Sequence, residues 1–169
     1  TRLSSRVDSA FHALAVDEAR KPFEPAIWQQ SPTAGDQRLE QVWFRGVHCD
    51  VGGGYAETGL SDIALGWLAQ RARENGLAFT EGAFTQAGNA TEGPLPALST
   101  FQPDPFGTLH DSRTGLYRFL PPAPRVLGAE PRSREFVASS AIERTAVDPA
   151  SMPANLRDAV DDGIEVMDV

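Results

Sequence analysis

The pattern of apolar positions predicts a strand, a glycine turn and a helix in the first half of the chain. β-Branched and aromatic residues gather in the stretch 39–47, as is typical of a short buried strand. The glycines Gly52–Gly54 cannot continue such a strand. Apolar residues then cover most of the circumference of a helix that opens at Ser61, and Asn75-Gly76 supplies its C-terminal cap. Strand, turn and helix together make one α/β unit.

The other elements follow weaker patterns. Val7, Phe11 and Leu14 lie at i, i+4 and i+7, which predicts an amphipathic helix over about 5–17. Glycine, proline and threonine scattered through 81–105 indicate loop. The stretch 134–144 suits either a strand or a helix. A short helix is expected at 154–160.

Length and composition narrow the class of protein. A chain of 169 residues is the size of one domain, and its net charge of −8 argues against a nucleic-acid partner or an anionic membrane surface. The single cysteine, Cys49, excludes an intrachain disulfide. The sequence shows no apolar run of transmembrane length and no signal peptide pattern. It starts with Thr1 rather than methionine, so we expect a processed product or a piece of a longer protein.

His48 is the leading candidate for chemistry because it stands where the predicted strand ends. Ligands bind at the carboxyl ends of strands in open α/β folds, and an imidazole exchanges protons near neutral pH. The alternative is a structural histidine that caps the strand. If the chain stays extended, Asp50 projects to the same side as His48 and could orient the imidazole, bind a cation with it, or cap the glycine turn. We favour the capping role for Asp50.

The turn itself offers backbone amides. Gly52, Gly53 and Gly54 could aim them at an anion, in the manner of an oxyanion loop. The lysine of a P-loop and the spaced glycines of a dinucleotide fingerprint are missing, so a nucleotide site is disfavoured. No cysteine and histidine spacing fits zinc, and we predict no cofactor and no metal. An oxygen-rich cation site at His48, Asp50 and Asp62 is the weakest hypothesis.

Two further points concern catalysis: His110 is a second candidate histidine, and a serine in a nucleophile motif is missing. His110-Asp111-Ser112 has the residue types of a catalytic triad, but sequence neighbours rarely converge as a triad requires. We interpret this tripeptide as a loop, with His110 as a minority candidate for catalysis or binding. No serine in the chain lies in a Gly-x-Ser-x-Gly elbow, so the chain lacks the nucleophile motif of α/β hydrolases.

The stretch 42–55 (VWFRGVHCDVGGGY), followed by 60–67 (LSDIALGW), resembles the signature of an uncharacterised α/β hydrolase family, a domain of unknown function that includes type VI secretion phospholipase effectors. The segment 11–28 resembles the part of that family before the strand. Weaker similarity appears at 109–112 and 140–144. The resemblance implies that a Gly-x-Ser-x-Gly nucleophile and an acid precede Thr1, and that His48 is the catalytic base.

The resulting expectation is an α/β fold: the C-terminal portion of an α/β-hydrolase-like domain at 1–78, with a loop-rich C-terminal extension at 79–169 packed on it. We expect a serine esterase or phospholipase-like activity on an ester or phospholipid substrate once the missing half is present. We also expect pairing with a second chain or a homo-oligomer, and a cytoplasmic or secreted effector. The alternative is a noncatalytic interaction domain that keeps the hydrolase scaffold and binds a partner through the loops after Phe79.

Overall fold

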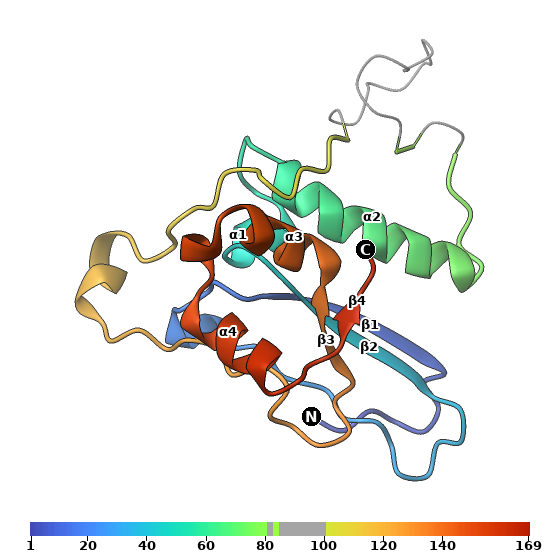
Figure 1. The fold of residues 1–169 in the computed structure, drawn as a ribbon. Coiled ribbons are helices and arrows are strands. Elements are labelled where there is room, and N and C mark those ends of the chain that lie inside the picture. Colours follow the sequence, from blue (N-terminus) through green and yellow to red (C-terminus); the bar gives the residue numbers. More distant parts are fainter. Residues whose placement is uncertain (81–82, 85–100) are drawn as a thin grey trace.

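The fold is built on one parallel sheet. The computed structural model describes residues 1–80, 83–84 and 101–169. In that part of the chain four strands lie side by side in the order β1-β2-β3-β4, and every neighbouring pair is parallel (Figure 1). Their bounds are Ser9–Ala15 for β1, Arg38–Phe44 for β2, Glu135–Ala138 for β3 and Val166–Met167 for β4. A parallel sheet with helices between its strands confirms the predicted α/β class.

α-Helices lie in the connections from β2 to β3 and from β3 to β4, whereas the connection from β1 to β2 contains only a 3-10 turn. They are α1 (His48–Gly52), α2 (Gly59–Glu74), α3 (Ser139–Val147) and α4 (Ala154–Asp161), with 3-10 turns at Lys21–Phe23, Gly115–Phe119 and Pro149–Ser151. The helix expected at 154–160 is confirmed. The strand expected at 39–47 is also present, but it ends at Phe44, three residues earlier than predicted. The ambiguous stretch 134–144 contains both structures, first β3 and then the start of α3. The loop expected at 81–105 falls largely outside the described residues.

The helix predicted over 5–17 is wrong, because this stretch contains β1. Phe11 meets Trp67 of α2 edge to face, at 6.3 Å between ring centroids, while its neighbour His12 stacks on Trp28 at 4.5 Å. The two contacts lie on opposite faces of the strand, so both faces are covered and the sequence shows no alternation of apolar and polar residues. Parallel pairing with β2 decides the conformation, and no local pattern reveals it.

The helix α2 follows its sequence signals closely. It begins at Gly59, two residues before the expected cap at Ser61, whose hydroxyl instead donates to the Thr58 carbonyl at 3.0 Å. Its end is as predicted: Gly76 has a φ of 93°, and the Leu77 amide donates to the Ala72 carbonyl at 3.0 Å, as in a Schellman motif.

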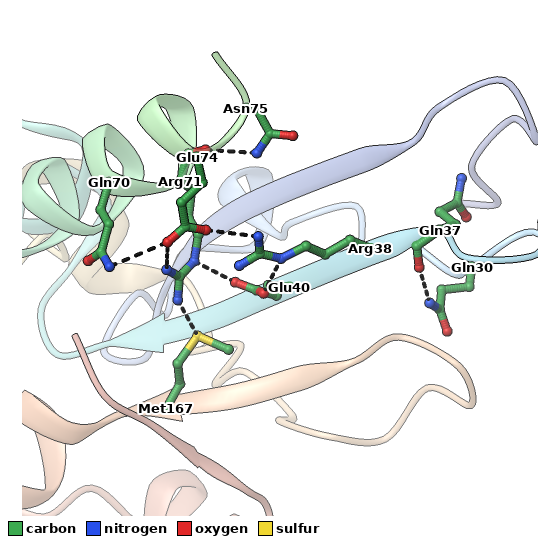
Figure 2. A network of polar contacts seen from close by, with 9 residues as sticks. All are labelled: Gln30, Gln37, Arg38, Glu40, Gln70, Arg71, Glu74, Asn75 and Met167. Carbon is green, nitrogen blue, oxygen red and sulfur yellow. Dashed lines mark hydrogen bonds and ion pairs between the residues drawn. The ribbon is translucent and has the colours of Figure 1, made fainter. Parts of the chain in front are cut away.

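A polar network fastens α2 to β2 (Figure 2). The carboxylate of Glu40 accepts from Arg38 and Arg71, each at 2.7 Å, and Glu74 accepts from the same two arginines at 2.8 and 3.0 Å. Beside it, Gln30 donates to the Gln37 carbonyl at 2.6 Å. Because Glu40 is shared between a strand residue and a helix residue, the network fixes how α2 lies along the sheet.

The second half of the chain contributes to the same core. Trp43, Val137 and Leu156 are each almost completely buried in one apolar cluster. The division expected at 78/79 stays a prediction, but β3 and β4 show that residues after this boundary extend the sheet of the first half. No helix in the described residues combines the length and apolar character that a membrane span requires.

Candidate functional site

Polar residues gather where β1 and β2 end. Asp17 and Glu18 follow β1, and the turn that follows β2 leads directly into α1 (Figure 1). The strands are parallel, so these two ends share one edge of the sheet. Segment 110–112 reaches the same edge from much later in the chain.

Asp17 ties the two strand ends together. Its carboxylate accepts from the Nε of Arg45 at 2.9 Å and from the Gly46 amide at 2.6 Å. The buried Arg45 also donates to the Ser151 carbonyl at 2.9 Å. This pairing holds the turn before α1 in place, so the residues that follow are presented from a rigid support.

Glu18 is a buried hub beside that turn. Its side chain is 1% exposed and takes two hydrogen bonds from the guanidinium of Arg20, at 3.0 and 2.8 Å. The Ser112 hydroxyl donates to it at 3.0 Å and the His48 amide at 3.3 Å. Burial alone would raise the pKa of Glu18, but these donors outweigh it and bring the pKa down to about 2. Glu18 is therefore an ionised structural group, unsuited to general acid work near neutrality.

His48 is the first residue of α1 and its side chain is exposed. The ring lies against Phe23, with 5.2 Å between centroids. It stands beside a groove of about 520 Å³, whose lining includes Glu18, Pro22 and Val51. The imidazole is thus displayed at the carboxyl edge of the sheet next to open space, which is where a substrate-facing base would stand.

Asp50 does not share a side with His48, because residues 48–52 are helical rather than extended. Side chains two apart on a helix point in nearly opposite directions, and Asp50 is 3% exposed. One oxygen of Asp50 accepts from the Val47 amide at 2.9 Å and the His110 amide at 3.2 Å. Asp50 therefore does cap backbone amides, but those of Val47, just before α1, and of the distant His110 rather than those of the glycines.

The other oxygen of Asp50 binds a side chain 60 residues away. It lies 2.6 Å from Nδ1 of His110, and the Tyr55 ring stacks on that imidazole at 3.7 Å between centroids. Nε2 of His110 lies 3.5 Å from the exposed carboxylate of Glu57. A buried carboxylate that contacts one imidazole nitrogen while the other nitrogen faces outward has the same arrangement as the acid and base of a catalytic triad.

The remaining candidate residues, Asp62 and Gly52–Gly54, have contacts and backbone angles that suit a structural role. Asp62 is buried in the first turn of α2, where it accepts from the Thr58 hydroxyl at 3.0 Å and the Gln102 amide at 2.8 Å. Gly52 ends α1 and lines the groove, while Gly53 and Gly54 have φ values of 84° and 130°, which favour glycine. Within the described ranges, no group of three or more His, Cys, Asp or Glu side chains is arranged to hold a metal ion.

The structure thus does not bring Asp50 and Asp62 together with the side chain of His48, and it joins Asp50 to His110 instead. Sequence reasoning placed His110 in a locally satisfied loop and did not single out Glu18 or Ser112. The signal for the last two was present: 11–28 and 109–112 both belong to the resemblance, and their side chains meet at 3.0 Å.

Comparison with known proteins gives a match for the N-terminal part of the chain. Residues 1–71, which contain β1, β2, α1 and most of α2, match a family model described as "T6SS, Phospholipase effector Tle1-like, catalytic domain". No curated protein and no solved structure matches the chain. The match includes His48 and Asp50 and ends before His110. In its first 71 residues, the chain is therefore similar to the catalytic domain of Tle1-like phospholipase effectors of type VI secretion systems.

Proposed function

We propose that the chain is the C-terminal portion of a serine ester hydrolase of the phospholipase type, and that His48 is its general base. The observation that carries this proposal is the exposed imidazole of His48 at the shared carboxyl edge of β1 and β2, beside an open groove. The similarity of residues 1–71 to a phospholipase catalytic domain supports the substrate class.

The chemistry requires a serine that this sequence lacks in the expected motif. His48 would take the proton of that serine hydroxyl as its oxygen attacks the ester carbonyl. The protonated imidazole would then give this proton to the departing alcohol, leaving an acyl-enzyme. Water, deprotonated by the same imidazole, would then attack the acyl carbon and release the fatty acid. The imidazolium would return its proton to the serine oxygen, which restores the hydroxyl. The serine would come from a Gly-x-Ser-x-Gly segment of another polypeptide region, encoded in the same frame or as a companion chain.

His110 is the rival base for the same reaction, because it already has a carboxylate partner. Its 2.6 Å contact with Asp50 would orient the ring and stabilise the imidazolium. We rank it second because its outward nitrogen faces Glu57 and it does not line the groove. In the favoured scheme the Asp50 and His110 pair positions the start of α1, and thereby His48.

The test is reconstitution. The 169-residue chain alone should not react with a fluorophosphonate probe, whereas the chain combined with the Gly-x-Ser-x-Gly polypeptide should react and should hydrolyse a short-chain ester. His48→Ala should abolish turnover, while His110→Ala should retain part of it if that residue only positions α1. Loss of turnover in His110→Ala with full activity in His48→Ala would transfer the role of base to His110. A gene that begins near Thr1 and has no serine-bearing companion would favour the noncatalytic interaction domain.

A further inference from the structure

The 3-10 turn Gly115–Phe119 carries large apolar side chains on its outer side. Leu116 is 77% exposed and Phe119 is 85% exposed, and Leu120 after them is 47% exposed. Side chains three residues apart in a 3-10 helix lie one above the other, so Leu116 and Phe119 form one apolar ridge. Figure 1 shows this turn, in gold, projecting from the body of the molecule. Adjacent apolar side chains at such exposure commonly mark a surface that contacts a partner.

The loop that carries the apolar ridge is fastened at both of its ends. At the first end, the Ser112 hydroxyl donates to the buried Glu18 at 3.0 Å. At the second, the Ala123 amide donates to the Ala19 carbonyl at 2.8 Å. Both anchor points belong to the segment that follows β1, so the loop leaves the body and returns to it at one place.

Hydrogen bonds also close the turn itself. Arg113 donates from Nη2 to the carbonyl of Leu120, seven residues away, at 2.7 Å. Within this span the Tyr117 amide donates to the Thr114 carbonyl at 3.1 Å. Residues that are already ordered lose little conformational entropy when a partner binds them. The apolar ridge is therefore a preformed contact surface.

The loop is basic although the protein is acidic. Between Asp111 and Glu130 the sequence contains Arg113, Arg118 and Arg125 and no acidic residue, whereas the whole chain has 23 acidic residues. Charges more than about 8 Å apart are largely screened at physiological salt, so the local charge rather than the net charge decides what approaches the ridge. Apolar side chains flanked by arginines are typical of segments that lie in the interface of a bilayer.

The same loop reaches the candidate site. The ring of Tyr117 lies 5.3 Å from the guanidinium carbon of Arg20. That carbon is 3.8 Å from the centre of the Phe23 ring, which lies against His48 at 5.2 Å between centroids. A surface that contacts the apolar ridge would consequently lie close to the exposed imidazole.

We infer that the apolar ridge docks the protein on a phospholipid bilayer, with Leu116 and Phe119 at the acyl chains and the exposed Arg118 at the phosphates. This inference rests on the proposed function, because the ester bonds of a phospholipid lie just below the phosphates of such a surface. Docking through the ridge would bring the edge of the sheet that carries His48 toward those esters. The arginines and the absence of acidic residues favour a phosphate-bearing surface over a second copy of this acidic chain.

The experiment measures binding of the 169-residue chain to vesicles of phosphatidylcholine with about 30% phosphatidylglycerol by co-sedimentation. The parent chain should bind. Leu116→Ser combined with Phe119→Ser should weaken binding at least about tenfold, because two large apolar side chains no longer enter the lipid. Absence of binding by the parent, or unchanged binding by the double variant, would overturn the inference.

A matched double variant controls for exposed apolar surface in general. Leu77→Ser combined with Val147→Ser removes side chains that are 55% and 71% exposed elsewhere on the molecule, and it should bind as the parent does. Because all four side chains are exposed, neither double variant should shift the midpoint of urea denaturation. Equal losses of binding in the two double variants would show nonspecific adhesion and overturn the inference.

The charge is tested in the same way. Arg118→Gln should weaken binding to these vesicles about fivefold, as loss of one basic residue at an anionic surface does. Arg157→Gln, which removes an exposed arginine of α4, should leave binding unchanged. Equal effects of the two substitutions would contradict a docking site at the loop.

Vesicle binding requires neither a serine nor turnover, so it separates this inference from the proposed function. Binding that depends on the ridge, without ester hydrolysis on reconstitution, would retain the docking surface and remove the proposed function. Hydrolysis of a soluble short-chain ester without vesicle binding would retain the function and overturn the docking surface. Self-association that Leu116→Ser with Phe119→Ser abolishes, in a chain that does not bind vesicles, would assign the ridge to a second copy and overturn the inference.

Discussion

The two edges of the sheet differ in strand length and in charge, which influence whether a further strand can pair there. At one edge, β1 is seven residues long, uncharged apart from the titratable His12, and bordered by the groove. At the other, β4 has two residues, half-exposed Val166 among them, and Glu165 and Asp168 flank it. Short length and adjacent charges are the usual means of closing a sheet edge.

The difference between the edges coincides with the position of the candidate site. Glu18, His48 and Asp50 all lie at the ends of β1 and β2, on the side of the open edge. The β4 side carries no such cluster among the described residues. In the described residues, the polar cluster therefore lies beside the long edge strand β1 and its groove, away from the short edge strand β4.

The largest expected effect compares side chains at the two sides of the sheet. In the reconstituted enzyme, His48→Ala should lower kcat by about 10³-fold or more, as loss of a general base does. Ser139→Ala, which removes a hydroxyl that contacts Asp168 beside β4, should change kcat by less than about twofold. Steady-state ester hydrolysis measures kcat for both variants. Comparable losses of kcat would show that the two sides of the sheet do not differ in function.

The next effect concerns Glu18, the buried carboxylate at the end of β1. Because its pKa is lowered from 4.5 to about 2 in the folded chain, the unfolded chain takes up the proton first as the pH falls. The stabilisation, about 3 kcal/mol, is complete above pH 4.5 and is lost between pH 4.5 and 2. Urea titrations from pH 6 to 2 should show this decline in the parent. Glu18→Gln should be less stable at pH 6 and should lack this part of the decline. A parallel decline of stability in both chains would refute the predicted contribution of Glu18.

A smaller loss is expected from His110→Ala. The substitution removes the 2.6 Å contact to the buried Asp50, and a hydrogen bond to a charged group contributes about 2 kcal/mol. Chemical denaturation measures the free energy of unfolding. His110→Gln is the matched control, because its amide can still donate to Asp50 and should recover part of the loss. Unchanged stability in His110→Ala would show that the pair does not hold α1.

The smallest effect is expected at the closed edge. Val166→Lys places a charge on an exposed position of β4 and should change the free energy of unfolding by no more than about 0.5 kcal/mol. Chemical denaturation measures this change, and a loss of more than about 2 kcal/mol would contradict the exposed position of Val166.

Sequence reasoning succeeded where local signals and burial agree. The β2 strand and the C-terminal cap of α2 follow from residue type and spacing, whereas His48, expected at the strand end, is the first residue of α1, four residues after β2 ends at Phe44. It failed at β1, where an i, i+4, i+7 spacing imitated a helix because both faces of the strand are covered. The condition that would have put Asp50 on the same side as His48, an extended chain after Val47, is not met, because residues 48–52 are helical.

The sequence by itself determined the α/β unit around His48, because an apolar run, a glycine turn and a capped helix are properties of neighbouring residues. Only the tertiary structure decided that Asp50 meets His110 and that Glu18 meets Ser112, since these partners are 60 and 94 residues apart. It also decided which edge is open. Parallel pairing joins strands that are distant in the chain, and in the part of the chain that the structure describes β1 becomes an edge strand only because one of its sides is bonded to β2.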